Sequence, residues 1–176
     1  MREVYSVEIR GLKPYLMHAF KGDDGKKKVG TKPTVEEDCE SALYRKQDGT
    51  IYVPSMQLEA SLKNAGKEKI FRGRKTFWEM IMAGVSVEPF EIPIQPQEFE
   101  PFTTGVVIGD ARIMKARPMF KNWSLNFRLI VTDARMVEVN LKDLLKIAGD
   151  SKGIGDWRPK FGLYEVASWQ KVSLVR

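Results

Sequence analysis

A glycine-rich stretch near the C-terminal end most constrains how this chain can fold. Residues 149–162 read Gly-Asp-Ser-Lys-Gly-Ile-Gly-Asp-Trp-Arg-Pro-Lys-Phe-Gly. Before them, an apolar stripe predicts a helix over 141–148, with Asn140 as its cap and Gly149 as its end. After them, residues 163–167 have the pattern of a strand. Because glycine tolerates conformations and close approaches that a Cβ would block, we predict a tight loop between that helix and that strand.

The clearest strand pattern lies just before this helix, at residues 123–132. Trp123, Leu125, Phe127, Leu129 and Val131 alternate with mostly polar residues, which is typical of a strand with one buried face. Residues 106–115 are also strand-like, and we predict that they pair with 123–132 in antiparallel fashion. Residues 3–10 predict a first strand.

Helix signals organise the region between these strands. Thr34 and Glu37 form a capping-box pattern at the start of a predicted short helix over 34–46. A strand over 51–53 leads into a helix that opens at Ser55 and is predicted to stop at Gly66. Residues 77–84 predict a short helix with Trp78 in the core. A strand follows over 85–88, and the proline-rich residues 89–105 predict a long extended connection.

The order of these elements predicts an α+β fold with a ferredoxin-like or RRM-like βαββαβ core and an antiparallel sheet. A length of 176 residues is typical of a single domain. We therefore expect one domain over 1–176, with basic loop insertions near 20–50 and 67–105 and the C-terminal glycine-rich loop. No aromatic RNP sequence of the RNA-recognition motif is present.

Composition narrows the classes of function. Lys and Arg total 29 against 23 Asp and Glu, for a net charge of +6, which favours an anionic partner. The single cysteine, Cys39, and the single histidine, His18, exclude disulfides within the chain and most zinc sites. We expect no cofactor and no metal. No apolar run could span a membrane and no signal-peptide pattern is present, so the expected setting is cytoplasmic, without a membrane partner.

Three short segments resemble, in order, motifs of the RAMP superfamily of CRISPR-associated proteins. Gly153–Gly162 resembles that family's C-terminal glycine-rich loop after the second helix. Residues 53–63 resemble the strand that ends in Pro-Gly-Ser and opens the first helix, although Pro54 stands where glycine is usual and Glu59 where a small residue is usual. The first strand with residues 14–18 resembles the family's N-terminal strand and turn. The resemblance covers nearly the whole chain through short motifs.

The resemblance implies binding of single-stranded nucleic acid, and among subunit types a backbone subunit that assembles side by side along the strand, as a homo-oligomer or filament. The resemblance does not decide whether the strand is RNA or DNA. It also does not decide whether the protein acts in a CRISPR, phage or recombination setting. The basic and aromatic residues then become the predicted nucleic-acid contacts. They are Lys26, Lys27, Lys28, Ser55, Arg72, Arg74, Lys75, Arg112, Lys115, Arg117, Lys152, Trp157, Arg158, Lys160 and Phe161. Trp157 could equally anchor the loop in the core, and Ser55 could be a plain helix cap.

Two other functions remain open. A metal-independent endoribonuclease would use His18 to take a proton from a ribose 2′-OH, and a metal-dependent variant would use Asp23 or Asp24. A protein-interaction module without nucleic acid would use the proline-rich surface of 89–105. The leading prediction is therefore a sequence-nonspecific, non-enzymatic protein that binds single-stranded nucleic acid.

Overall fold

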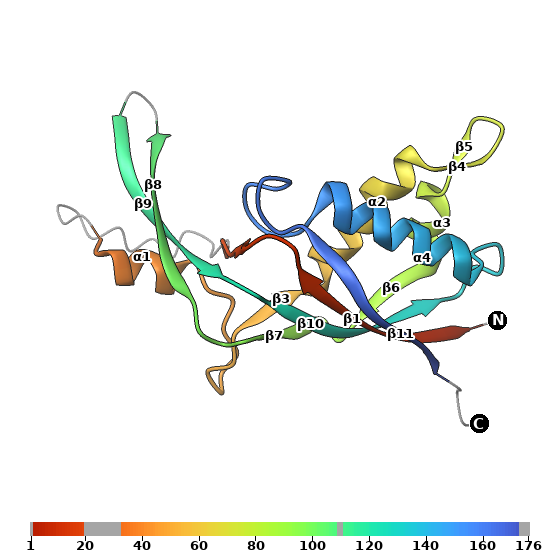
Figure 1. The fold of residues 1–176 in the computed structure, drawn as a ribbon, viewed down its shortest axis with the longest axis horizontal. Helices are drawn as coiled ribbons and strands as arrows, with labels where there is room; N and C mark the ends of the chain where they lie inside the picture. Colours follow the sequence, from red (N-terminus) through yellow and green to blue (C-terminus); the bar gives the residue numbers. More distant parts are fainter. Residues whose placement is uncertain (1, 20–32, 109–110, 173–176) are drawn as a thin grey trace.

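The computed structural model describes residues 2–19, 33–108 and 111–172, and its centre is an antiparallel sheet (Figure 1). Strand β1 (Glu3–Gly11) lies between β11 (Tyr164–Val172) and β10 (Ser124–Val131), and β10 also pairs with β6 (Val85–Glu88). Helix α2 (Ser55–Glu68) lies in the connection from β1 to β6, and α4 (Glu138–Ile147) lies between β10 and β11. The spatial order β11–β1–β10–β6 is the split βαβ arrangement of a ferredoxin-like fold, which confirms the predicted fold class.

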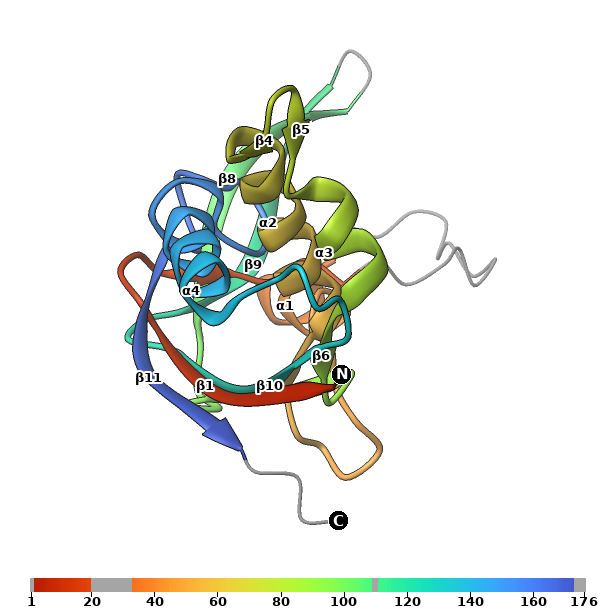
Figure 2. The same cartoon turned by 90° about the vertical axis from the view of Figure 1, so that its right-hand side faces the viewer.

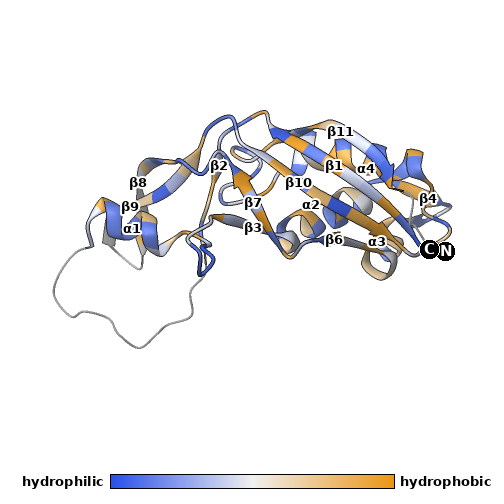
Figure 3. Ribbon diagram, turned by 90° about the horizontal axis from the view of Figure 1, so that it is seen from below, coloured by the Kyte–Doolittle hydropathy of each residue, from blue (hydrophilic) through white to orange (hydrophobic). Residues whose placement is uncertain are grey.

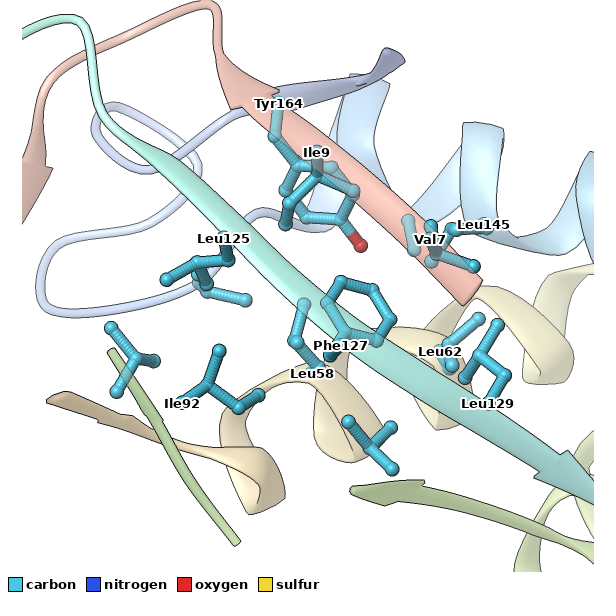
Figure 4. Packing of buried hydrophobic residues seen from close by; sticks show 14 of the residues in the cluster. Val7, Ile9, Leu58, Leu62, Ile92, Leu125, Phe127, Leu129, Leu145 and Tyr164 are labelled. Atoms are coloured by element: carbon cyan, nitrogen blue, oxygen red, sulfur yellow. The ribbon is translucent and has the colours of Figure 1, made fainter. Parts of the chain in front are cut away.

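The hydrophobic core lies between one face of this sheet and helices α2 and α4 (Figure 2). The predicted alternation in β10 is confirmed, because its odd-numbered residues from 125 to 131 are all buried. Leu58 and Leu62 of α2 and Leu145 of α4 meet these strands from the helix side (Figure 4). Burial of a Leu or Phe side chain contributes about 1.5–3 kcal/mol, so this layer supplies much of the folding free energy.

The opposite face of the sheet is turned toward the viewer in Figure 3. On β1 and β10 this face carries Ser6, Glu8, Arg10, Asn126 and Arg128 together with the apolar Val4 and Ile130, and none of the strands β1, β6, β10 and β11 places an aromatic ring there. Its charges are largely neutralised within the sheet, since Arg10 pairs with Glu8 at 3.0 Å and Arg128 with Glu88 at 3.5 Å. The stacking platform that RRM proteins present on their sheet is therefore missing from these strands.

A hairpin of two long strands, β8 (Glu100–Ile108) and β9 (Ala111–Phe120), projects from one end of the molecule (Figure 1). This corrects two predictions. Residues 106–115 do not pair with 123–132, because the two halves of the hairpin pair with each other and β10 goes to the middle of the sheet. Residues 89–105 contain β7 (Glu91–Gln95) and most of β8. Pro89 and Pro96 lie just outside β7 and Pro101 lies on the edge strand β8, whereas Pro93 lies inside β7.

Three shorter elements pack around the base of this hairpin. Strand β2 (Tyr15–Leu16) pairs with β9, and β3 (Tyr52–Pro54) pairs with β7. Helix α1 (Val35–Ser41) begins with the predicted capping box, in which the Glu37 N–H donates to Thr34 Oγ1 at 3.2 Å and the Thr34 N–H donates to Glu37 Oε2 at 2.9 Å. Asp38 on α1 then accepts hydrogen bonds from Lys115 Nζ at 2.8 Å and the Ala116 N–H at 3.2 Å, which ties α1 to β9.

The other end of the molecule carries a small hairpin, β4 (Ile70–Arg72) with β5 (Lys75–Thr76), followed by α3 (Trp78–Gly84). The prediction that Trp78 lies in the core is wrong, since Trp78 is 38% exposed. Met80 and Ile81 form the buried face of α3, and Phe77 just before the helix is buried as well. Gly66 does not end α2 either. A Cβ at Gly66 would lie 2.4 Å from Ile81 Cδ1, so the glycine serves the close packing of α2 against α3.

The helix before the glycine-rich stretch differs from the prediction at both ends. It starts at Glu138 with Val137 at the cap position, so Asn140 lies within the first turn and caps nothing. At its C-terminal end it passes into a single π-helical turn, η1 (Ala148–Lys152), and the turn closes at Gly153, whose φ is +65°. Within the described residues, no helix is long and apolar enough to cross a membrane.

Candidate nucleic-acid interface

The glycine-rich loop, residues 153–162, is held by hydrogen bonds to the body of the protein and within itself. The Gly162 N–H donates to Pro14 O at 2.8 Å and the Asp156 N–H donates to Leu16 O at 2.9 Å. Within the loop, the Ile154 N–H donates to Gly162 O at 3.0 Å. The backbone donors of the loop are thus largely used in folding, and the loop offers its side chains to a ligand instead of a backbone cradle.

Glycines are required in this loop because it lies directly against the first strand–turn segment. A Cβ at Gly155 would lie 2.5 Å from the Tyr15 ring and 2.6 Å from Leu16 O. Gly162 has a φ of +72°, and a Cβ there would lie 1.8 Å from Ile154 O. Trp157 adopts a φ of +53°, a region that a bulky side chain enters only when its surroundings impose it. The body of the protein therefore sets the conformation that presents Trp157.

Trp157 belongs to an aromatic cluster shared by the loop and the β8–β9 hairpin. Its ring meets Phe102 of β8 edge-on, with centroids 5.9 Å apart at 89°, and Phe161 packs on Phe102 at 5.3 Å. Phe161 is buried, whereas Trp157 keeps 39% of its surface exposed. Phe161 thus anchors the cluster. Trp157 makes an edge-on contact with this cluster and leaves part of its ring surface available to stack on a base.

The cations of the loop differ in whether they are already paired. Arg158 and Lys160 are exposed and have no ion-pair partner in the described part of the chain. Lys152, in contrast, forms an ion pair with Glu68 at the end of α2. Arg158 and Lys160 follow Trp157 closely in sequence, so two free cations and one partly exposed ring lie on the same short segment.

On the hairpin, two of the predicted cations, Lys115 and Arg117, are engaged with the body of the protein. Lys115 is bound to Asp38 of α1, as described above. Arg117 Nε lies 3.5 Å from Asp156 Oδ2, and Arg117 Nη1 donates to Ala116 O at 3.1 Å. Arg112 belongs to β9 by its backbone, and its side chain is outside the described part of the structure.

His18 lies beside the same carboxylate. Its Nδ1 is 3.5 Å from Asp156 Oδ2, and its side chain is 48% exposed. Partial burial, reinforced by the positive charge of Arg117, lowers the pKa of His18, and the Asp156 carboxylate opposes this shift. Asp156 is therefore the carboxylate partner of His18.

The remaining predicted contacts do not join this group. Arg72, Arg74 and Lys75 lie on the β4–β5 hairpin, at the opposite end of the long axis from β8 and β9 (Figures 1 and 3). Ser55 is buried, is the first residue of α2 and not its cap, and its N–H donates to Phe90 O at 2.8 Å. Lys26, Lys27, Lys28, Asp23 and Asp24 lie outside the described residues.

Reasoning from sequence missed Asp156 and Phe102 as members of the site. Asp156 stands directly before Trp157, so its place in the loop was visible, but its contacts depend on β9 and on the segment after β2. Nothing in the local sequence marks Phe102.

Among the residues that the structure describes, no three His, Cys, Asp or Glu side chains gather as a metal site would require.

Comparison with known proteins gives a structural likeness only. No family model matches this chain, and no curated protein matches its sequence. Among solved structures, 60 chains match. One is a chain of the type III-B Cmr-beta bound to cognate target RNA, solved by cryo-EM, with a TM-score of 0.60 and 15% sequence identity. The match covers 97% of this chain and 61% of that one, so this chain spans less than two thirds of its length. At this level of identity the likeness shows a shared fold.

Proposed function

We propose that this protein binds single-stranded nucleic acid without base specificity, through the surface formed by Phe102, Arg117, Trp157, Arg158 and Lys160, with His18 at its edge. We call this the loop–hairpin surface. The observation that carries the proposal is a partly exposed tryptophan next in sequence to two unpaired cations, on a loop that is hydrogen-bonded to the body of the protein. Proteins that bind single strands combine stacking rings with cations that meet phosphates, and this combination reads no base edge.

Three further facts support the proposal. The net charge of +6 favours a polyanion, and the uncovered face of the sheet has paired arginines and no aromatic rings on strands β1, β6, β10 and β11. The matched chain of the type III-B Cmr-beta comes from a structure bound to target RNA, which supports a nucleic-acid partner for the shared fold. We infer that RNA is at least one of the polymers bound.

Assembly along the strand is the finer part of the proposal. Arg72, Arg74 and Lys75 are exposed cations at the far end of the long axis, without ion-pair partners among the described residues. A strand held on the loop–hairpin surface of one copy would reach these cations on a neighbouring copy if successive copies along the strand align end to end along their long axes. This arrangement gives the distant basic patch a role in the same complex.

Trp157→Ala separates binding from stability. We expect it to weaken single-strand binding by roughly 5- to 150-fold, the equivalent of one lost base stack of ~1–3 kcal/mol. It should lower the free energy of unfolding by only about 1 kcal/mol, because an edge-on aromatic contact is worth ~0.5–1.5 kcal/mol. Fluorescence anisotropy with a labelled oligonucleotide and urea unfolding measure the two quantities.

The matched control is Trp78→Ala, since Trp78 has nearly the same exposed fraction, 38% against 39%, on the far side of the molecule. It should leave affinity unchanged. Equal losses of affinity in the two variants would contradict the assignment of Trp157 to the interface.

The contact between His18 and Asp156 favours a second function, cleavage of RNA without a metal. A carboxylate beside Nδ1 can orient a histidine that acts as a general base, and the lowered pKa of His18 favours the neutral form that a base requires. In this case, cleavage of an RNA hairpin in EDTA should fall by roughly 10²–10⁴-fold in His18→Ala. A hairpin with a 2′-deoxy residue at the cleaved position is the control. Cleavage that survives His18→Ala, or no cleavage by the unmodified protein, would remove this function.

A further inference from the structure

The carboxylate of Asp156 lies between two side chains that come from different parts of the chain. Its Oδ2 is 3.5 Å from His18 Nδ1, in the segment after β2, and 3.5 Å from Arg117 Nε on β9. A single oxygen thus faces both groups. It does so inside the loop–hairpin surface, next to Trp157 in the chain.

The position of this carboxylate is set by the backbone. The Asp156 N–H is bonded to Leu16 O at 2.9 Å, and Asp156 Oδ1 accepts from the Trp157 N–H at 3.0 Å. The preceding Gly155 fits against Tyr15 with no room for a Cβ. The acid is therefore directed at His18 and Arg117 by the fold of the loop.

The two contacts are long for an ion pair of this kind. Charge-assisted N–H···O bonds are usually about 2.7–2.9 Å, and both distances here exceed that range. The carboxylate faces the two groups without forming a short hydrogen bond to either. A phosphodiester has two free oxygens and can accept from both donors at once, so it would satisfy them better than Asp156 does.

We propose that His18 and Arg117 form a phosphate subsite, which Asp156 occupies in the free protein and a phosphodiester of a bound strand takes over. The proposal rests on the proposed function, because the phosphate is that of the strand on the loop–hairpin surface. Asp156 acts here as a specificity-determining residue. An isolated phosphate must displace it alone, whereas a strand also gains contacts with Trp157, Arg158 and Lys160. The carboxylate therefore favours the polymer over free anions.

The single histidine of the chain reports directly on this subsite. The charged groups that act on it are Arg117 of β9 and Asp156 of the loop. Losing the Asp156 charge should lower the pKa of His18 further, because the carboxylate opposes the effects of burial and Arg117. A phosphate in the subsite should raise that pKa, since an anion favours the imidazolium form.

The experiment compares Asp156→Asn with the parent protein. Asparagine can still accept from the Trp157 N–H, so the loop should keep its fold. In Asp156→Asn we expect the affinity for a labelled single strand to rise about 3- to 10-fold, with a salt slope steeper by about 0.7, the value of one extra phosphate contact. Inorganic phosphate should raise the NMR-measured pKa of His18 by about half a unit or more in this variant, and by less in the parent protein.

Two controls make the result specific. Asp150→Asn removes the same charge from η1, where Asp150 is exposed, and should change the affinity less than about twofold. Asp156→Asn combined with Arg117→Gln should lose both the gain in affinity and the response of His18 to phosphate. Unchanged or weaker binding in Asp156→Asn, or a phosphate response that persists without Arg117, would overturn the proposal.

The affinity for oligonucleotides and the response of His18 to phosphate test the two proposals independently. If phosphate shifts His18 in Asp156→Asn but no oligonucleotide binds any variant, the subsite stands and the proposed function falls. If oligonucleotides bind the parent protein and Asp156→Asn binds no more tightly, the proposed function stands and the role of Asp156 falls.

Discussion

Replacing Arg158 and Lys160 together by glutamine is expected to weaken single-strand binding by roughly 50- to 100-fold at about 50 mM salt, with little change in folding stability. Both side chains are exposed and have no ion-pair partner in the described structure, so their charges are available to phosphates. Each phosphate contact on a single strand contributes about 0.7 to the slope of log affinity against log salt concentration. The slope should therefore become shallower by about 1.4.

A control double variant tests whether binding depends on the loop–hairpin surface or only on the net positive charge of the protein. Arg10→Gln with Arg128→Gln removes the same two charges from the uncovered face of the sheet, where each is paired with a glutamate. That control should keep the slope of the parent protein. If the two double variants lose affinity and slope equally, binding follows net charge and the loop–hairpin surface is not the site.

Gly162→Ala is expected to produce the largest loss of stability, about 3–5 kcal/mol. The left-handed conformation at φ +72° costs an L-residue roughly 1–2 kcal/mol. The new Cβ would also lie 1.8 Å from Ile154 O, and because that oxygen belongs to the backbone, the loop itself must move. Such a loss is a large fraction of the ~5–15 kcal/mol that stabilises a typical domain. Urea unfolding followed by circular dichroism measures it.

The control for this variant is Gly49→Ala. Gly49 has a φ of +89° and nothing within 4 Å of the position that a Cβ would take. It should cost only the conformational term, roughly 1–2 kcal/mol. A loss in Gly162→Ala no greater than that in Gly49→Ala would show that the loop is not packed as described.

Local sequence patterns predicted which segments form helices and strands better than they predicted which strands pair with each other. The capping box at Thr34, the alternation from Leu125 to Val131 and the strand after the glycine-rich loop all depend on neighbouring residues, and all are confirmed. The partner of the strand at 106–115 depends on distant contacts, and that prediction was wrong. The prediction for Trp78 was wrong for a related reason, because the aromatic character of a residue does not indicate which face of a short helix packs against the core.

The candidate site divides in the same way. The glycine-rich loop placed Trp157, Arg158 and Lys160 together because they are close in sequence. Trp157 also clusters with Phe102, and Asp156 contacts His18 and Arg117. These contacts join segments that are far apart in the chain, and no local sequence pattern marks them. The glycines also proved to serve packing against Tyr15 and Leu16 more than the cradling of a ligand by backbone N–H groups.

The central claim is tested most directly by binding of fluorescent single-stranded RNA and DNA of increasing length to the unmodified protein, over a range of salt concentrations, with the particle size recorded. We expect affinity to fall as salt rises, with a slope of about −1.4 or steeper, and particles to gain copies of the protein as the strand lengthens. The comparison of the two polymers would also show which sugar is preferred. No binding to either polymer at low salt, or an affinity that does not respond to salt, would contradict the proposed function.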